Sequence, residues 1–160
     1  MAPQLALLTS AGTPLPPAHD VITVTGSRVL EHAQAISLLN THAQVWLGRS
    51  YTWLVGGARG LDHWCIEWLL SHGEACVAVV PFTIADQPVE VQPILRRLPT
   101  VVALALPRAA SSYARRNQYM VDASSVVLGF WVDKGGTYRT LQYALRNGRQ
   151  VHAIHVAAKE

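Results

Sequence analysis

The sequence predicts a single α/β domain of the doubly wound type, in which a mainly parallel sheet carries helices on both faces. The chain contains several short runs in which every residue is apolar, rather than apolar and polar residues in alternation. Such runs are typical of strands buried on both sides. Segments of helical composition separate these runs, which is the order expected for a parallel sheet. The chain has 160 residues, of which 50% are hydrophobic and 14% charged. This composition supports one well-packed core and excludes an intrinsically disordered chain.

The first 19 residues are expected to form a leader in front of the domain. They contain Pro3, Pro14, Pro16 and Pro17, and proline interrupts long regular elements. The domain itself is expected over residues 20–160. No charge run or low-complexity tract interrupts that part of the chain, so the sequence predicts no second domain.

Two strand–turn–helix units open the domain. The β-branched run at 21–25 predicts a strand, and the Ala- and Leu-rich segment at 29–47 predicts the helix that follows it. The apolar run at 52–55 predicts the second strand, followed by a helix over 61–71. Gly73 comes directly after this helix and is suited to end it as a C-terminal cap.

The remaining elements continue the alternation. Strands are predicted at 75–80, 101–106 and 125–130 because each run is short and apolar. A short helix that ends at Arg96 and Arg97 lies between the first two of these strands. A polar helix over 111–122 precedes the third.

The last predicted elements are a helix over 138–147 and a strand over 150–155. Because crossovers between parallel strands are right-handed, the turns from strand to helix are expected at the carboxyl edge of the sheet. Folds of this class bind their ligands at that edge.

Three of these turns are rich in glycine and open a helix: residues 26–28, 56–60 and 135–137. The start of a helix offers unpaired backbone N–H groups and a partial positive charge, and missing side chains let an anion approach closely. One such turn could be only a tight connection, since glycine tolerates positive φ. Three of them at one edge predict a site for a phosphorylated ligand.

The candidate ligand-binding residues come from these turns and from the polar helix. They are Gly26, Ser27, Arg28, Gly56, Gly57, Ala58, Arg59, Gly60, Asp62, Arg116, Asn117, Asp133, Gly135, Gly136 and Thr137. An arginine at a helix start can fork onto phosphate oxygens. Asp62 either stabilises the start of its helix or accepts a hydrogen bond from Arg59 or a ribose hydroxyl.

Several classes of protein and site are not supported. No turn has the spacing of a P-loop or the GxGxxG pattern of a dinucleotide-binding dehydrogenase. The two cysteines have no metal-ligand spacing, so no metal site is expected. A formal charge of +3 is too small for a non-specific polyanion coat. No apolar run reaches membrane-spanning length and no secretory signal is evident, so a cytoplasmic protein without membrane contact is expected.

The order of four motifs resembles the SLOG superfamily. The motifs are VTGSR at 24–28, VGGARGLD at 55–62, RNQYM at 116–120 and GGT at 135–137. This superfamily joins the Rossmann-like domain of the DNA-processing protein DprA/Smf to the Lonely-guy phosphoribohydrolases and to small stand-alone nucleotide-binding members, which this chain resembles most. The resemblance covers about residues 20–155. It implies a Rossmann-like fold, a nucleotide-sized pocket at the carboxyl edge and self-association, as a homodimer.

Within that resemblance, Gly26, Ser27 and Arg28 would face the ligand, and residues 135–137 would hold a phosphate. Gly56, Gly57 and Arg59 would line the floor of the pocket. Lonely-guy enzymes carry a glutamate one helical turn beyond their Gly-Thr pair. Here Arg139 and Thr140 stand at that place, and Asp62, Asp133 or Glu67 could replace the missing carboxylate only if the fold brings one to the reacting carbon.

The preferred interpretation is therefore a protein that binds a small phosphorylated nucleotide or nucleotide derivative, as a sensor or carrier, with no required cofactor and no assigned catalytic residue. The first alternative is a nucleoside 5′-monophosphate phosphoribohydrolase of the Lonely-guy kind or a related nucleotide hydrolase. The second, not favoured, is DprA-like binding of single-stranded DNA, which needs stacking platforms; Trp131, Tyr113, Tyr119 and Tyr138 are the candidates near the proposed pocket.

Overall fold

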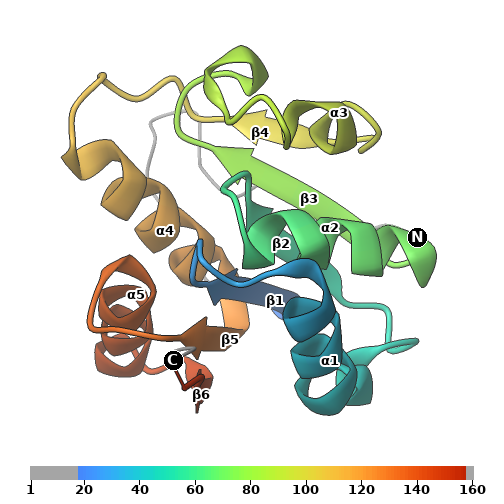
Figure 1. Ribbon diagram of the computed structural model, residues 1–160. Helices are drawn as coiled ribbons and strands as arrows, with labels where there is room; N and C mark the ends of the chain where they lie inside the picture. The colour runs from blue at the N-terminus through green and yellow to red at the C-terminus, as the bar shows by residue number, and fades with distance from the viewer. Residues whose placement is uncertain (1–17, 158–160) are drawn as a thin grey trace.

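The structure, a computed structural model, describes residues 18–157. Its strands are β1 (Ala18–Gly26), β2 (Thr52–Gly56), β3 (Ala75–Val80), β4 (Val101–Ala103), β5 (Ser124–Trp131) and β6 (Gln150–His155). All neighbouring strands are parallel, and the order in the sheet is β4-β3-β2-β1-β5-β6 (Figure 1). The doubly wound α/β class is confirmed. The expected leader lies, except for its last two residues, outside the described part of the chain.

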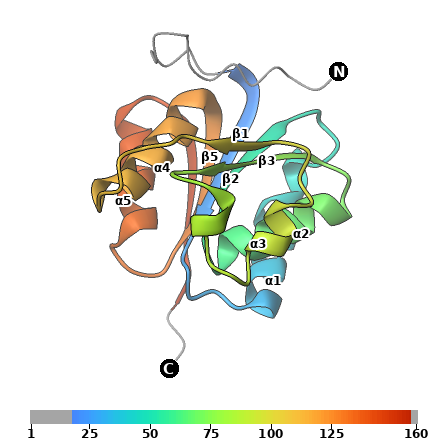
Figure 2. The same cartoon turned by 90° about the horizontal axis from the view of Figure 1, so that it is seen from above.

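Helices cover both faces of the sheet. They are α1 (His32–His42), α2 (Leu61–Ser71), α3 (Gln92–Leu95), α4 (Ser111–Ala123) and α5 (Gly136–Arg146), with 3-10 turns η1 (Gln44–Trp46) and η2 (Ile84–Asp86). Figure 2 shows α1, α2 and α3 on one side of the strands and α4 and α5 on the other. Every strand in the middle of the sheet is therefore shielded from water on both faces, which explains the continuously apolar runs.

Alternate residues of β1 pack into different cores. Ile22 and Val24 belong to the large cluster beneath α1 and α2, whereas Val21 belongs to a smaller cluster beneath α4. All three are at most 1% exposed. The two cores hold the helices at fixed positions around the end of β1, where the site forms.

Several boundaries differ from those expected. The helix expected over 29–47 is shorter, because residues 28–31 form a loop and Gly48, at a φ of 71°, ends the segment after η1. The strand expected at 101–106 ends at Ala103, because Ala105 has a φ of 52°, which is outside the range of a β-strand, although the amides of Leu104 and Leu106 still donate to the carbonyls of Val80 and Pro81. In contrast, α5 begins two residues earlier than expected, at Gly136.

The strand order reverses between β1 and β5. The chain runs from β1 outward to β4, then crosses to the other side of β1 to form β5 and β6. At such a switch point the two connections leave in opposite directions, and a crevice opens at the carboxyl ends of the strands. The turns that follow β1 and β5 border this crevice.

No helix within residues 18–157 is long and apolar enough to cross a membrane.

Candidate functional site

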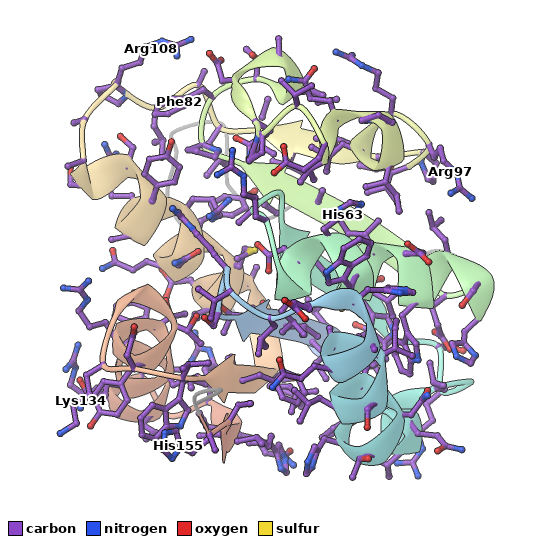
Figure 3. The ribbon with its side chains drawn as sticks, in the orientation of Figure 1. His63, Phe82, Arg97, Arg108, Lys134 and His155 are labelled. Atoms are coloured by element: carbon purple, nitrogen blue, oxygen red, sulfur yellow. The ribbon has the colours of Figure 1, made fainter. Side chains whose placement is uncertain are left out.

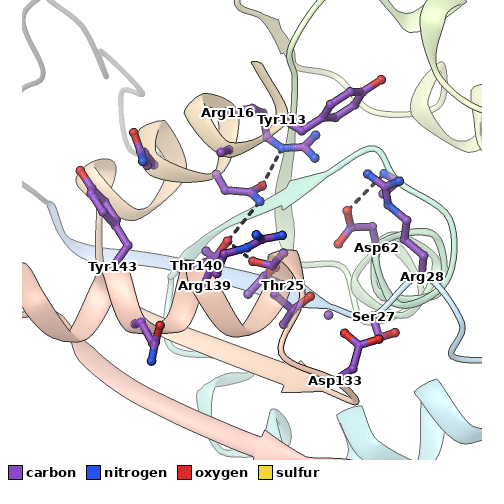
Figure 4. A pocket seen from close by; sticks show the side chains of 18 of the residues that line it. Thr25, Ser27, Arg28, Asp62, Tyr113, Arg116, Asp133, Arg139, Thr140 and Tyr143 are labelled. Carbon is purple, nitrogen blue, oxygen red and sulfur yellow. Dashed lines mark hydrogen bonds between the residues drawn. The ribbon is translucent and has the colours of Figure 1, made fainter. Parts of the chain in front are cut away.

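A cavity of about 980 Å³ opens at the switch point, at the carboxyl ends of β1 and β5 (Figure 4). Its walls are the turns that follow β1, β2 and β5 and the facing surfaces of α4 and α5. This volume is in the range of pockets that hold small ligands, and the position is the usual one in open α/β sheets.

Most of the residues expected at the site line this cavity. They are Gly26, Ser27, Arg28, Ala58, Asp62, Arg116, Asn117, Asp133, Gly136 and Thr137. Four segments that are far apart in the sequence therefore converge. The remaining five expected residues, Gly56, Gly57, Arg59, Gly60 and Gly135, are not part of the lining.

Two of these glycines allow the walls to pack closely. A Cβ on Gly56 would lie 2.8 Å from Oδ2 of Asp62 and 2.9 Å from Cζ of Arg116. Gly60 has a φ of 71°, and a Cβ there would lie 2.6 Å from the carbonyl oxygen of Ser27. Glycine is required at both positions because the neighbouring groups occupy the space of a side chain.

Arg59 points away from the expected floor. Its guanidinium forms an exposed ion pair with Glu90. Gly57 also serves a neighbouring loop, because its carbonyl oxygen accepts a hydrogen bond of 2.7 Å from Nε2 of Gln87. The expectation that Arg59 and Gly57 line the floor is therefore corrected, and Asp62 and Arg116 lie there instead.

The turns after β1 and β2 use backbone donors within the protein. The amide of Ser27 donates to the carbonyl of Phe130 at 3.0 Å, which continues the pairing of β1 with β5. The amide of Leu61 donates to the carbonyl of Ser27 at 3.2 Å, and that of Ala58 donates to Asp62 Oδ2 at 3.2 Å. These bonds hold the two turns together. They also leave fewer free amides in these turns than the prediction of three anion-binding turns requires.

The N-terminus of α5 keeps its amides free. Gly135 caps the helix, and its own amide donates to Oδ1 of Asp133 at 3.0 Å. The amides of Gly136 and Thr137, both in the cavity wall, have no hydrogen-bond partner among residues 18–157. A Cβ on Gly136 would meet nothing within 4 Å, so an anion has open access to this end of the helix.

Arg116 is a buried cation in the cavity wall. It is 3% exposed, and its Nη1 donates to the carbonyl of Val79 at 3.2 Å while Nε donates to Oδ1 of Asn117 at 2.8 Å. Burial lowers the pKa of this guanidinium, and the carboxylate of Asp62 acts in the opposite direction. Its Nη2 group has no hydrogen-bond partner in the described part of the chain.

A hydrogen-bonded chain joins this arginine to the start of α5. Nδ2 of Asn117 donates to Oγ1 of Thr140 at 3.1 Å, and this hydroxyl donates to the carbonyl of Gly136 at 2.8 Å (Figure 4). Arg116 and Asn117, which lie side by side on α4, therefore orient the first turn of α5. This explains why the same site contains an arginine–asparagine pair and a glycine–threonine turn.

Asp62 is a buried acid near Arg116, on the other side of Gly56. It is 6% exposed, and burial raises its pKa to about 6, although Arg116, the Ala58 amide and Arg28 each favour the charged form. Oδ2 is the acceptor for Ala58, and Oδ1 has no hydrogen-bond partner among residues 18–157. A pKa displaced by burial, in a group that lines a cavity, is typical of a functional site.

One of the four expected aromatic side chains borders the cavity. Tyr113 is 40% exposed, and the guanidinium of Arg28 lies 5.5 Å from the centre of its ring. Trp131, Tyr119 and Tyr138 are not part of the lining. Trp131 instead stacks on His155, which is labelled in Figure 3, at a ring distance of 4.0 Å.

Sequence reasoning did not select one face of α5 as part of the site. Arg139, Thr140, Tyr143 and Arg146 line the cavity and recur at helical spacing from Gly136. That spacing is visible in the sequence once the helix start is known, so it could have identified them. Of the three carboxylates considered as replacements for the missing glutamate, Asp62 and Asp133 line the cavity. The third, Glu67, lies elsewhere and contacts His32 at 3.4 Å.

Comparison with known structures agrees with this architecture. DNA processing protein A from Streptococcus pneumoniae superposes with a TM-score of 0.73 at 19% identity, over 84% of this chain and 50% of that one. DNA processing protein A from Helicobacter pylori, reported for its single-stranded DNA binding mode, superposes with a TM-score of 0.69 at 15% identity, over 83% of this chain and 64% of that one. The molybdenum cofactor binding protein from Rippkaea orientalis superposes with a TM-score of 0.66 at 16% identity, over 87% of this chain and 78% of that one.

These similarities establish the fold, and the chain spans half the length of the pneumococcal protein. No curated protein matches the sequence. The model of the family described as DNA recombination-mediator protein A matches residues 3–160, which is nearly the entire chain. The resemblance to the superfamily that includes DprA/Smf is confirmed, and the chain belongs to the DNA recombination-mediator protein A family.

Proposed function

We propose that the cavity binds a nucleotide or nucleotide derivative, with a phosphate at the N-terminus of α5. The observation that carries this proposal is the pair of free amides at Gly136 and Thr137, which face a cavity of ligand size. Phosphate is the anion that such helix starts commonly bind, through the amides and the helix dipole together.

Charge around the cavity supports an anionic ligand. Four arginines line it, against two carboxylates: they are Arg28, Arg116, Arg139 and Arg146, facing Asp62 and Asp133. Arg139 follows the free amides by less than one helical turn and is exposed, so its guanidinium can reach a phosphate held there. Tyr113 at the rim offers an aromatic surface for a base.

A binding protein is favoured over a nucleotide hydrolase. Thr140, at the place of the glutamate in the related hydrolases, is buried, and its hydroxyl is engaged with Asn117 and Gly136. No carboxylate is available at that point of α5 to activate water. We therefore propose a sensor or carrier role that requires no cofactor.

Native mass spectrometry of freshly purified protein tests the proposal. We expect a bound species with the mass of a nucleotide, released on denaturation. Incubation with the four common ribonucleoside 5′-monophosphates, followed by chromatography, should return intact nucleotide. Free base that disappears in the Arg116→Ala variant would contradict the binding role and favour the hydrolase.

Binding of single-stranded DNA is the second candidate, because two structural relatives are DNA processing proteins and one was reported for such binding. The exposed arginines Arg28, Arg139 and Arg146 beside Tyr113 provide charges and a stacking surface. Neutralising three phosphates of a single strand predicts a slope of about −2 in a plot of log affinity against log salt. A salt-independent or undetectable affinity for an oligonucleotide would exclude this candidate.

A further inference from the structure

Two buried side chains near the cavity each keep one polar atom without a hydrogen-bond partner in the described part of the chain, and neither lies at the start of α5. Asp62 is 6% exposed and Arg116 is 3% exposed, yet Oδ1 of the acid and Nη2 of the base have no hydrogen bond to residues 18–157. The single fully buried side-chain polar atom without a partner in that part of the chain is Oγ1 of Thr52. The free atoms of Asp62 and Arg116 therefore retain access to the open space of the cavity.

The two groups are held against the same piece of backbone. A Cβ on Gly56 would lie within 3 Å of Asp62 Oδ2 and of Arg116 Cζ and Nη1. No ion pair within 4 Å joins Asp62 and Arg116, so neither group is occupied by a direct contact with the other. The wall thus presents an acceptor next to a donor, both in place before a ligand arrives.

The position of this pair relative to α5 sets the size of the ligand. Asp62 follows β2, α5 follows β5, and β1 lies between these strands in the sheet. Two spacings between neighbouring strands separate the end of β2 from the end of β5 by about 10 Å. Inorganic phosphate cannot span this distance, whereas a nucleotide has its sugar and base on that scale from its phosphate.

The charges of the two ends orient the ligand. A phosphate is favoured at the helix start and disfavoured beside a carboxylate. Asp62 accepts hydrogen bonds when ionised and therefore requires a group that donates one. The neutral part of a nucleotide carries such donors in the hydroxyls of a ribose and in the amino group or ring N–H of a base.

Building on the proposed function, we propose that Asp62 is a specificity-determining residue that accepts a hydrogen bond from an uncharged donor at the end of the ligand remote from its phosphate, while the adjacent Arg116 holds a neighbouring acceptor. The site then selects among phosphorylated ligands by the presence of that donor. A buried acceptor left without its partner is costly, so the discrimination is strong.

Isothermal titration calorimetry on the full chain tests this assignment. The four common ribonucleoside 5′-monophosphates first identify the tightest ligand. Its 2′-deoxy and 3′-deoxy forms then test the sugar hydroxyls, and its form without the base amino group tests the base. We expect one of these deletions to weaken binding by about tenfold or more, since a hydrogen bond to a charged group is lost. The analogue that fails identifies the donor.

The Asp62→Asn variant provides the matched comparison. The amide keeps the shape of the acid and an oxygen for the Ala58 amide, but its NH₂ group can face the cavity as a donor. We expect this variant to bind the intact ligand and the deleted analogue with similar affinity. Arg59→Ala is the control, because Arg59 lies outside the cavity and pairs with Glu90; it should retain the discrimination of the unmodified protein.

A second measurement needs no variant. Burial raises the pKa of Asp62 to about 6, so the ionised acceptor is replaced by a neutral acid that carries a donor as the pH falls through that value. The groups that act on it are the guanidinium groups of Arg116 and Arg28, and the thiols of Cys65 and Cys76, which are neutral because burial raises their pKa values. The ratio of the affinity for the intact ligand to the affinity for the analogue without the donor should be smaller at pH 5 than at pH 7.5. Changes in the phosphate itself cancel, since both ligands carry it.

The outcomes separate the two proposals. Tight binding of a monophosphate with equal affinity for every deleted analogue, at both pH values, would overturn the assignment of Asp62 and leave the nucleotide site standing. Absence of binding by all four monophosphates would overturn the proposed function and this inference with it. A tenfold loss for one analogue in the unmodified protein that persists in Asp62→Asn would assign the selectivity to another residue and also overturn the inference.

Discussion

Replacing Gly136 with proline removes one of the two free amides and fixes φ at a value that suits a helix. Gly136 is the first residue of α5, where proline fits because its ring matches the helical φ and the missing N–H has no partner within the helix. A side chain at this position meets nothing within 4 Å, so the protein should fold as before. Gly136→Ala is the matched control, because it adds a side chain but keeps the amide.

The expected effect follows from one lost hydrogen bond to an anion. Such a bond contributes about 1.5–3 kcal/mol, which corresponds to a dissociation constant raised about 10- to 100-fold. Calorimetric titration with a ribonucleoside 5′-monophosphate measures the change, and circular dichroism with thermal melting verifies folding. Gly136→Ala should stay within about threefold of the unmodified protein. Equal affinities for the proline and alanine variants, both folded, would refute phosphate binding at this helix start.

Four further outcomes are expected. Gly56→Ala should lower the free energy of unfolding by about 1–3 kcal/mol in urea titrations, because its Cβ collides with Asp62 and Arg116. An unchanged midpoint of urea unfolding would show that these side chains can move aside. Asn117→Leu should lower the free energy of unfolding by about 1–3 kcal/mol and weaken nucleotide binding, because Arg116 Nε and Thr140 lose their shared partner. Full nucleotide affinity in this variant would contradict the role of Asn117 in orienting the first turn of α5. The pKa of Asp62 is raised to about 6 on folding, so its contribution to stability improves as the pH falls from 8 towards 4. Asp62→Asn should lose that improvement, on the order of 3 kcal/mol, in unfolding titrations at the two pH values, and parallel pH profiles would contradict the burial of a charged group. Light scattering should give a dimer of the 17.5 kDa chain, and a monomer at all concentrations would contradict the expected self-association.

Sequence reasoning predicted the fold well because the sheet is buried on both faces. A run such as residues 75–80 can only be an interior strand when every position is apolar, and helices must then cover it. Boundaries were less predictable where the backbone leaves the extended conformation. The strand that starts at Val101 ends at Ala103 because Ala105 has a φ of 52°, and nothing in the apolar residues 104–106 indicates that.

The sequence predicted the place of the candidate site in the fold more accurately than it predicted which atoms are free to bind a ligand. The glycine-rich turns do meet at one edge, as parallel topology requires. Which of their amides stay free depends on long-range bonds that no local pattern reveals. Ser27 gives its amide to Phe130, and Arg59 turns to Glu90. The polar chain from Arg116 through Asn117 to Thr140 likewise depends on the packing of α4 against α5.

The central claim is that a phosphate binds at the first turn of α5. A ¹H–¹⁵N NMR titration of the isotopically labelled chain with a ribonucleoside 5′-monophosphate tests it most directly, because each backbone amide reports separately. The largest downfield shifts should fall on Gly136 and Thr137, with smaller changes along the turn after β1. Shifts confined to residues remote from the cavity, with these two amides unmoved at saturation, would contradict the account.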